Sequence, residues 1–500
     1  MTIHQIEESE KTFATSHHLL NVLCDGLGGT AQAGESITFE GPGDISSPFP
    51  VLDLAASSFG ACGAAIADLM AAARHPAPEV TVDRRQSATW FDFPLAPTRP
   101  LGAAGQHGVH SKWMAEFETA DGRWVRVQGT FPTLRRRLLA ALQCGDDVDS
   151  IARAVAALPG EVAEDRLIAA GAAASLARPL DEWLQHPNGQ AVQEEPLARI
   201  SSTGPCDIGW QPTVGRPLLG VRVLDMTRIV AGPIGTRFLA SLGAEVLRID
   251  HPDGDEYKVW GVNDLSLGKR WATLDYQTTE GAEQLRRLIA SADVLVTSHR
   301  ADVLERIGLG LEDRAALRPG LIDVAMNSYG WTGPWRNRRG FDTLVQYATG
   351  IAHRVSAWAR EAPDSRLPLN ALGHLVDASR PRHLPVEALD FSTGYQVAAA
   401  VVFGLARRLR DGDGSALRLS LARTARLLHE TSFTNDDPTF TLPWASEAFE
   451  PGVFDMASRP SRRLAPPLMV EGVALRWDRP AERAGASAAR WSTDRAGDAQ

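Results

Sequence analysis

The clearest hydrophobic pattern in the chain is an alternation of short apolar runs with longer amphipathic segments between residues 216 and 328. The apolar runs are GVRVLDM, AEVLRID, DVLVTS and LIDVAMNS, and segments such as AGPIGTRFLASLG and TEGAEQLRRLIASA separate them. Strands that alternate with helices of about a dozen residues are typical of a parallel sheet covered by helices on both faces. We therefore predict an α/β fold for this part of the chain.

The N-terminal half has a different pattern. The segment FPVLDLAASSFGACGAAIADLMAAARH is rich in alanine and other small residues, and it predicts a buried helix that begins after Asp53. EVTVDRR and RWVRVQGTF alternate as strands do, and residues 133–182 have a helical composition. Gly, Pro and Ser are frequent in 201–217, which we interpret as a linker. The predicted organisation is a partly irregular lead-in over 1–45, a smaller α+β unit over 46–200, the linker, a main domain over 218–440 and an irregular tail over 441–500.

Two segments of the chain resemble each other. VLDLAASSFGACGAAIADLMAAAR and EALDFSTGYQVAAAVVFGLARR both carry an aspartate before a helix of small residues, and an alternating strand follows each. The alignment matches Asp53 with Asp390. Two alanine-rich helices with aspartate caps would explain the likeness without duplication. The strand after each helix favours an internal partial duplication.

Composition narrows the function classes. The chain has 500 residues and a formal net charge of −10, which argues against a broad nucleic-acid surface. Its four cysteines lie far apart with no CxxC pair, and its 13 histidines show no ligand spacing, so we expect neither disulfides nor a metal site. No uninterrupted apolar run reaches the roughly 18 residues that span a bilayer, and the N-terminal residues do not resemble a signal peptide. We expect a cytoplasmic protein without a membrane or nucleic-acid partner.

Nucleotide-binding motifs are absent in their standard forms. A strand, a turn and a helix lead to a strand that ends at Asp250, but AGPIG does not match GxGxxG, so we expect no nicotinamide cofactor. P-loop, GxSxG and HExxH motifs are also missing. Basic residues instead gather at or near the ends of predicted elements, where a ligand with several phosphates would bind. Solvated surface charge is the alternative for any one of them, and they are Arg248, Lys269, Arg270, Arg300 and Arg306.

A family resemblance runs in order through residues 220–440. PLLGVRVLDMTRIVAGPIGTRFLASLGAEVLRID, LSLGKRWATLDYQTTEGAEQLRRLIASADVLVTSHRADVLERIGLG and LIDVAMNSYGWTGPWRNRRGFDTLVQYATG resemble class III CoA-transferases, the CaiB/BaiF family. The resemblance implies a Rossmann-like large domain with a smaller domain, and transfer of CoA from an acyl-CoA to a carboxylic acid. No other cofactor is implied. Members of the family commonly form interlocked dimers, so the resemblance implies a homodimer or an intrachain pseudo-dimer.

The resemblance also implies roles for single residues. ALDFSTG is similar to the segment that carries the nucleophile, so Asp390 would attack the thioester to give an aspartyl anhydride and then an aspartyl-CoA thioester. The alternative is that Asp390 only caps its helix. The positions that resemble CoA contacts are Ile229, Val230, Ala231, Lys269, Arg270, Ser298, His299, Arg300 and Arg306, with Arg248 added from the basic set. Two other readings stay open: an acyl-CoA racemase or isomerase, and a CoA-binding subunit without catalysis. In racemases of the family a histidine precedes the aspartate of the GFD segment, and Phe341 stands there in this chain.

The N-terminal half is similar to a different part of the family. The segment around Asp53 resembles the nucleophile helix, and ADGRWVRVQGTFP with EDRLIAAGAAASLARPLDEWLQHPNGQAV resembles the small domain. We therefore interpret the chain as two incomplete copies joined together. Asp53 is then a second nucleophile or a relic that caps its helix, and we favour the relic because this half lacks its own nucleotide-binding opening.

Overall fold

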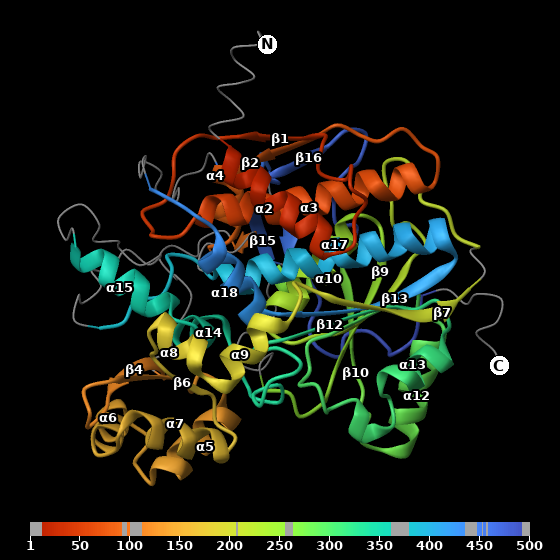
Figure 1. The fold of residues 1–500 in the computed structure, drawn as a ribbon. Coiled ribbons are helices and arrows are strands. Elements are labelled where there is room, and N and C mark those ends of the chain that lie inside the picture. The colour runs from red at the N-terminus through yellow and green to blue at the C-terminus, as the bar shows by residue number, and fades with distance from the viewer. Residues whose placement is uncertain are drawn as a thin grey trace.

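The computed structural model describes residues 13–92, 98–100, 113–206, 209–255, 264–361, 380–435, 448–452, 454–456 and 459–492. Its central element is a seven-stranded sheet with the order β10-β9-β8-β11-β12-β13-β7 (Figure 1). All neighbouring strands in it are parallel except β13 and β7, which pair antiparallel. The strands are β7 (Arg199–Pro205), β8 (Arg222–Met226), β9 (Glu245–Asp250), β10 (Lys269–Thr273), β11 (Val294–Thr297), β12 (Ile322–Asn327) and β13 (Asp413–Ser420).

Helices cover both faces of this sheet, as the apolar strands require. Val223 and Val294 belong to the core shared with one set of helices, whereas the next residues, Leu224 and Leu295, belong to a second core on the opposite face. Figure 1 shows α10 and α17 on the first face and α12 and α13 on the second. Their bounds are α10 (Ala231–Ser241), α12 (Thr279–Ala290), α13 (Leu311–Leu317), α14 (Asp342–Ala348), α15 (Ile351–Glu361), α17 (Ala388–Asp411) and α18 (Leu421–Glu430).

The two similar helices of the sequence lie side by side. In α3 (Val51–Ala72), Ser58 shares a hydrogen bond of 2.9 Å with Ser392 of α17, and the Cys62 thiol lies 3.3 Å from the carbonyl oxygen of Tyr395. Both contact positions advance along the two helices in the same direction, so the helices run parallel. Length and composition alone would let either helix cross a membrane, but 94% and 100% of their apolar windows are buried inside the protein. They are therefore placed as core helices. Whether they arose by duplication stays a hypothesis.

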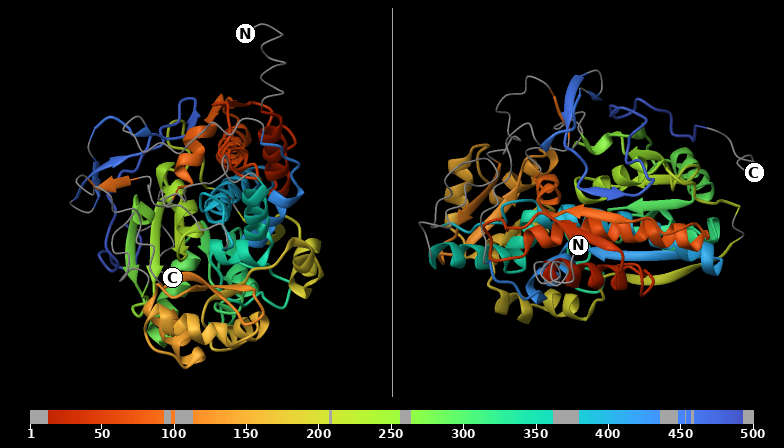
Figure 2. Two further views of the ribbon diagram at one scale, coloured as in Figure 1. Left: turned by 90° about the vertical axis from the view of Figure 1, so that its left-hand side faces the viewer. Right: turned by 90° about the horizontal axis from the view of Figure 1, so that it is seen from above.

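The N-terminal elements form two further units. The first packs a three-stranded sheet, β1-β2-β16, against α3, and its third strand, β16 (Leu468–Val470), comes from the C-terminal segment (Figure 1). The second is the antiparallel sheet β4-β5-β6 with its helices, which has its own apolar core and lies at one end of the molecule (Figure 2). The elements of this half are α2 (Ala14–Gly26), β1 (Ile37–Glu40), β2 (Val80–Asp83), α4 (Arg84–Trp90), β4 (Met114–Glu118), β5 (Trp124–Gln128), α5 (Pro132–Leu142), α6 (Val148–Ala156), α7 (Gly160–Ala169), β6 (Ala174–Leu176), α8 (Leu180–Gln185) and α9 (Pro187–Glu194). A further strand, β3 (Thr98–Pro100), belongs to a separate small sheet with two strands of the C-terminal segment.

Two predicted boundaries differ from the structure. The expected linker 201–217 begins inside β7, which closes the edge of the main sheet against β13. The expected irregular tail contains β14 (Phe454–Met456), β15 (Arg459–Arg463) and β16 (Leu468–Val470). Short strands of this kind escape a pattern search because their partners lie far away in the sequence: β16 pairs with β2. Residues 1–12, 441–447, 453, 457–458 and 493–500 of the predicted lead-in and tail lie outside the described residues.

Candidate active site

A cavity of about 560 Å³ lies at the carboxyl edge of the main sheet. Between β8 and β11 the chain order reverses, because β9 and β10 extend the sheet on one side and β11 begins the other. Such a switch point is the usual place for a ligand in an open parallel sheet. Residues that directly follow strands line the cavity here: Arg228 and Ile229 after β8, His251 after β9, Ser298, His299 and Arg300 after β11, and Ser328 after β12.

Asp390 lies in the wall of this cavity, in the first turn of α17. A close approach of α17 and α10 places it beside the turn that ends β8. A Cβ atom on Gly235 would lie 2.6 Å from the carbonyl oxygen of Gly394, and one on Gly394 would lie 2.5 Å from that of Ala231. Only glycine permits this spacing, so Ala231 and the first turn of α17 are held against each other.

The carboxyl group of Asp390 is one of three in a buried cluster. Its own backbone N–H donates a 2.8 Å hydrogen bond to Oδ2 of Asp342, and Asp390 is only 7% exposed. Burial, followed by the nearby charges of Asp342 and Glu387, raises the pKa of Asp390 well above its usual range. Burial also raises the pKa of Asp342 to about 6 and, with the Asp342 charge, that of Glu387 to about 8. The cluster therefore holds more protons near neutral pH than three ordinary carboxyl groups would.

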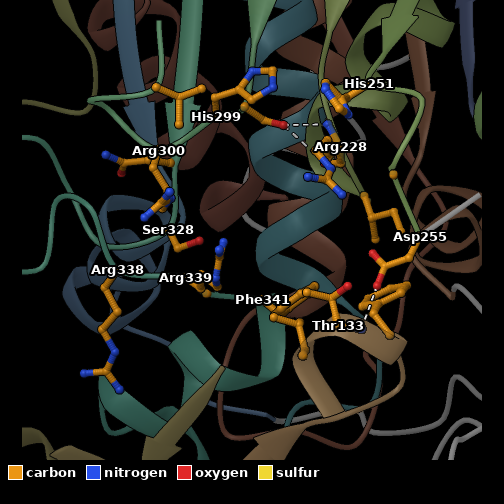
Figure 3. Close-up of a pocket in the computed structure, with 18 of the residues that line it drawn as sticks. Thr133, Arg228, His251, Asp255, His299, Arg300, Ser328, Arg338, Arg339 and Phe341 are labelled. Carbon is orange, nitrogen blue, oxygen red and sulfur yellow. Dashed lines mark hydrogen bonds between the residues drawn. The ribbon is translucent and has the colours of Figure 1, made fainter. Parts of the chain in front are cut away.

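The opposite wall of the cavity is basic. Figure 3 shows Arg228, Arg300 and Arg339 reaching toward the same space from three separate segments. His299 between them is neutral at physiological pH, because burial and then the Arg228 charge lower its pKa to about 4. Its Nε2 lies 3.4 Å from the hydroxyl of Tyr276, which also lines the cavity. This wall suits an anionic ligand that also presents aromatic or apolar parts.

The N-terminal half supplies part of the same cavity. Phe131, Thr133, Leu134 and Arg137, at the start of α5, all line it. Phe131 stacks on Phe341 with 6.0 Å between the ring centroids, and the backbone N–H of Thr133 donates to Asp255 at 2.8 Å. This part of the wall therefore carries both apolar and basic side chains, and the two halves of the chain build the cavity together.

Six of the ten predicted CoA-contact positions line the cavity: Ile229, Ala231, Ser298, His299, Arg300 and Arg306. Val230 is buried just before α10 and does not line it. The remaining three basic residues have internal partners. Lys269 is fully buried and donates to Asp225 at 2.9 Å, Arg248 pairs with Asp250 at 2.8 Å, and Arg270 pairs with Glu245 at 3.3 Å.

The position of these basic residues in the sheet explains the difference. Lys269 and Arg270 are the first two residues of β10, so they lie toward the amino end of the strand, away from the carboxyl edge that holds the cavity. Arg248 lies inside β9, where its guanidinium is 4.2 Å from the ring centroid of Trp271. The prediction placed all three near strand ends without distinguishing one end from the other.

Sequence reasoning missed several residues of the basic wall. Arg228 and His251 each come within two residues of a strand end, a signal that was present in the pattern. Arg338 and Arg339 precede Asp342 in RNRRGFD, and Arg338 also pairs with Glu164 of the small unit at 2.6 Å. Arg137 had no sequence signal, since it belongs to a helix that only the fold brings to the cavity.

Asp53 lies elsewhere. It lines neither this cavity nor the smaller one that adjoins it, and it is 2% exposed. Arg84 forms an ion pair with it at 2.9 Å, and the hydroxyl of Ser16 donates to it at 2.5 Å. Both contacts go to the Asp53 carboxylate and are typical of a structural ion pair. Within the described residues, no group of three or more His, Cys, Asp or Glu is placed to hold a metal ion.

Comparisons with known proteins agree on one family. Residues 218–454 match the model of CoA-transferase family III. The acetyl-coenzyme A transferase nodX of Hypoxylon pulicicidum is 32% identical over 232 residues, which are 45% of this chain and 36% of that protein. A succinate–glutarate CoA-transferase of Agrobacterium fabrum is 28% identical over 222 residues, 41% of this chain and 51% of that protein. The chain thus spans about half or less of the length of these relatives.

A likeness to solved structures was also found. A CaiB/BaiF family protein from Brucella suis aligns with a TM-score of 0.35 and 25% identity, over 49% of this chain and 65% of that chain. A protein from Mycobacterium tuberculosis aligns with a TM-score of 0.35 and 29% identity, over 43% of this chain and 58% of that chain.

Proposed function

Residues 218–454 belong to CoA-transferase family III, and from that premise we propose that the protein transfers CoA from an acyl-CoA thioester to a carboxylic acid, with Asp390 as nucleophile. The observation that carries this proposal is the shared cavity: Asp390 lies in its wall together with Arg228, Arg300 and Arg339. A thioester at Asp390 would leave the phosphates of CoA within the basic part of the same space.

The proposed chemistry uses two covalent intermediates. An oxygen of the Asp390 carboxylate attacks the thioester carbon, the C–S bond breaks, and a mixed anhydride and CoA thiolate result. The thiolate then attacks the side-chain carbonyl carbon of Asp390, which releases the first carboxylate and leaves an aspartyl-CoA thioester. The acceptor carboxylate attacks this thioester to give a second anhydride and thiolate. Attack of the thiolate on the acceptor carbonyl yields the new acyl-CoA and restores Asp390, with no net proton change.

The surroundings of Asp390 fit a nucleophile that is regenerated in each cycle. Its position in the first turn of α17 puts it in the positive field of the helix N-terminus, which favours its anionic form. Burial and the neighbouring carboxyl groups oppose ionisation, so the pKa of Asp390 is raised. The aspartate must lose its proton before it attacks, so the reaction depends on ionisation of a group whose pKa is raised.

An apolar cluster in the cavity wall supports an acyl group on the other side of the thioester. Phe131, Leu134, Ile229 and Phe341 form this cluster. We propose that the acyl chain of the donor lies against these side chains, so that both halves of the chain contact one substrate.

Trapping the intermediate tests the proposal. The protein is incubated with an acyl-CoA and then with hydroxylamine, and peptides are mapped by mass spectrometry. A hydroxamate at Asp390 is expected, and Asp53 serves as an internal control because its ion pair with Arg84 should leave it unmodified. Full activity of Asp390→Ala, or no modification at Asp390, would exclude it as the nucleophile. Asp390→Asn is the poorer variant because deamidation restores the aspartate.

A further inference from the structure

A second cavity of about 270 Å³ adjoins the first, and His299 and Arg300 line both. Its floor is a single row across four neighbouring strands, in which Thr297, Ala325, Arg418 and Arg199 are successive partners. Partners in a sheet point to the same face. Because Thr297 and Ala325 are small, the row leaves space above β11 and β12, with arginines beside it on β13 and β7.

The arginines around this space outnumber their acidic partners. Arg314 and Arg418 both pair with the fully buried Asp323, at 2.6 and 2.9 Å, so one carboxylate balances two guanidinium groups. Among the described residues, the side chains of Arg199 and Arg336 carry no ion pair, and both are exposed at the rim. The cavity therefore has an excess of positive charge.

Two acidic residues and one histidine also line the cavity, and the remaining lining residues are uncharged: Ser201, Ala301, Leu304, Leu311, Trp331 and Asn337. Asp302 is paired with Arg306 at 3.4 Å, and Glu305 is exposed to solvent, which screens its charge. Nδ1 of His299 is buried without a hydrogen-bond partner, while its Nε2 faces the Tyr276 hydroxyl. When Nε2 accepts that hydrogen bond, Nδ1 carries the proton and has no acceptor among the described residues.

We propose that this second cavity binds a phosphate group. Planar guanidinium groups from several directions match the oxygens of a phosphate better than a single point charge does. The phosphate has two sources: free inorganic phosphate, or a phosphate of CoA whose remainder occupies the first cavity and passes the shared residues His299 and Arg300. The second source rests on the proposed function. Arg199 precedes the segment that matches the family model, so this site is not contained in that segment.

Isothermal titration calorimetry on the full chain tests this proposal with three probes: CoA, 3′-dephospho-CoA and inorganic phosphate. The variants are Arg199→Gln and Arg336→Gln, which remove rim charges without emptying the core. Arg287→Gln is the matched control, because Arg287 is an exposed arginine on α12 that lines neither cavity. Loss of a charge-assisted contact to phosphate should weaken binding about tenfold.

The outcomes separate the two sources. If CoA supplies the phosphate, the native protein binds CoA more tightly than 3′-dephospho-CoA, and both rim variants reduce that difference while the control does not. If the phosphate is free, inorganic phosphate binds even at saturating CoA, and the rim variants weaken it. The proposal is overturned if both rim variants bind all three probes as the control does. Phosphate binding without any aspartyl hydroxamate at Asp390 would refute the proposed function and leave this site standing.

Discussion

The backbone N–H of Asp390 donates a hydrogen bond of 2.8 Å to Oδ2 of Asp342. Asp342 is the first residue of α14, and Asp390 lies in the first turn of α17. The Asp342 side chain therefore caps the N-terminus of α17. The same contact holds two carboxyl groups close together in a buried place. The Asp342 charge thereby adds to the effect of burial in raising the pKa of the proposed nucleophile.

Asp342→Asn should therefore move the pH dependence of the reaction. The asparagine keeps an oxygen that can accept the hydrogen bond but removes the charge, so the pKa of Asp390 falls. We expect the acid limb of kcat/KM to move to lower pH by about one unit. Asp253→Asn, which removes an exposed charge from the lining of the same cavity, is the control. An unchanged acid limb in Asp342→Asn would mean that Asp390 is not the group that titrates.

Glu387 predicts an effect on stability. Burial and the charge of Asp342 raise its pKa to about 8, from the ordinary value near 4.5. An acid whose pKa is higher in the folded state binds more protons there, so its contribution is fully present below pH 4.5 and is lost as the pH rises through about 8. Glu387→Gln should raise Tm at pH 8.5 relative to the native protein and change it little at pH 4.5. Thermal unfolding across this range measures the effect, with the exposed Glu35→Gln as control; equal shifts at both pH values would contradict it.

The main sheet could be predicted from the sequence because its strands are buried on both faces and show as continuous apolar runs between helices. The segment ALDFSTG pointed to Asp390, which lies in the cavity wall, and its role as nucleophile stays a prediction. Lys269 could not be placed correctly by the same means: its partner Asp225 lies 44 residues away, and only the sheet register brings the two together. A basic residue near the end of an element looks the same in a sequence whether it faces a ligand or an internal carboxylate.

The sequence pattern also could not predict that the N-terminal half contributes residues to the cavity. Arg137 and Phe131 lie on α5 and before it, in a unit with its own core, and contacts such as Phe131 with Phe341 join that unit to the sheet. The expected linker failed for a related reason. A strand at the sheet edge needs little hydrophobicity, and residues 201–205 have mostly small polar side chains.

Asp53→Asn distinguishes a structural aspartate from a second nucleophile. The substitution breaks a buried ion pair with Arg84, although Arg84 keeps its contact to Asp44 at 3.0 Å. We expect a loss of about 3 kcal/mol in the free energy of unfolding and unchanged CoA transfer per folded molecule. Urea unfolding and an acyl-transfer assay measure the two quantities. A folded Asp53→Asn protein without activity would instead indicate that Asp53 takes part in the reaction.

Dividing the chain between Gln211 and Pro212 tests whether the two halves depend on each other. The C-terminal fragment would lose α3, which packs beside α17, and β7, which pairs with β13. Loss of α3 exposes apolar surface on α17, whose apolar window is fully buried in the intact chain. It would also lose the wall of the cavity formed by Phe131 and Leu134. We expect neither fragment alone to transfer CoA, and we expect co-expression of both to restore transfer, because the contacts between them are non-covalent. Size-exclusion chromatography measures association of the two fragments and an activity assay measures CoA transfer, with the intact chain as the reference. Activity of fragment 212–500 on its own would contradict the prediction.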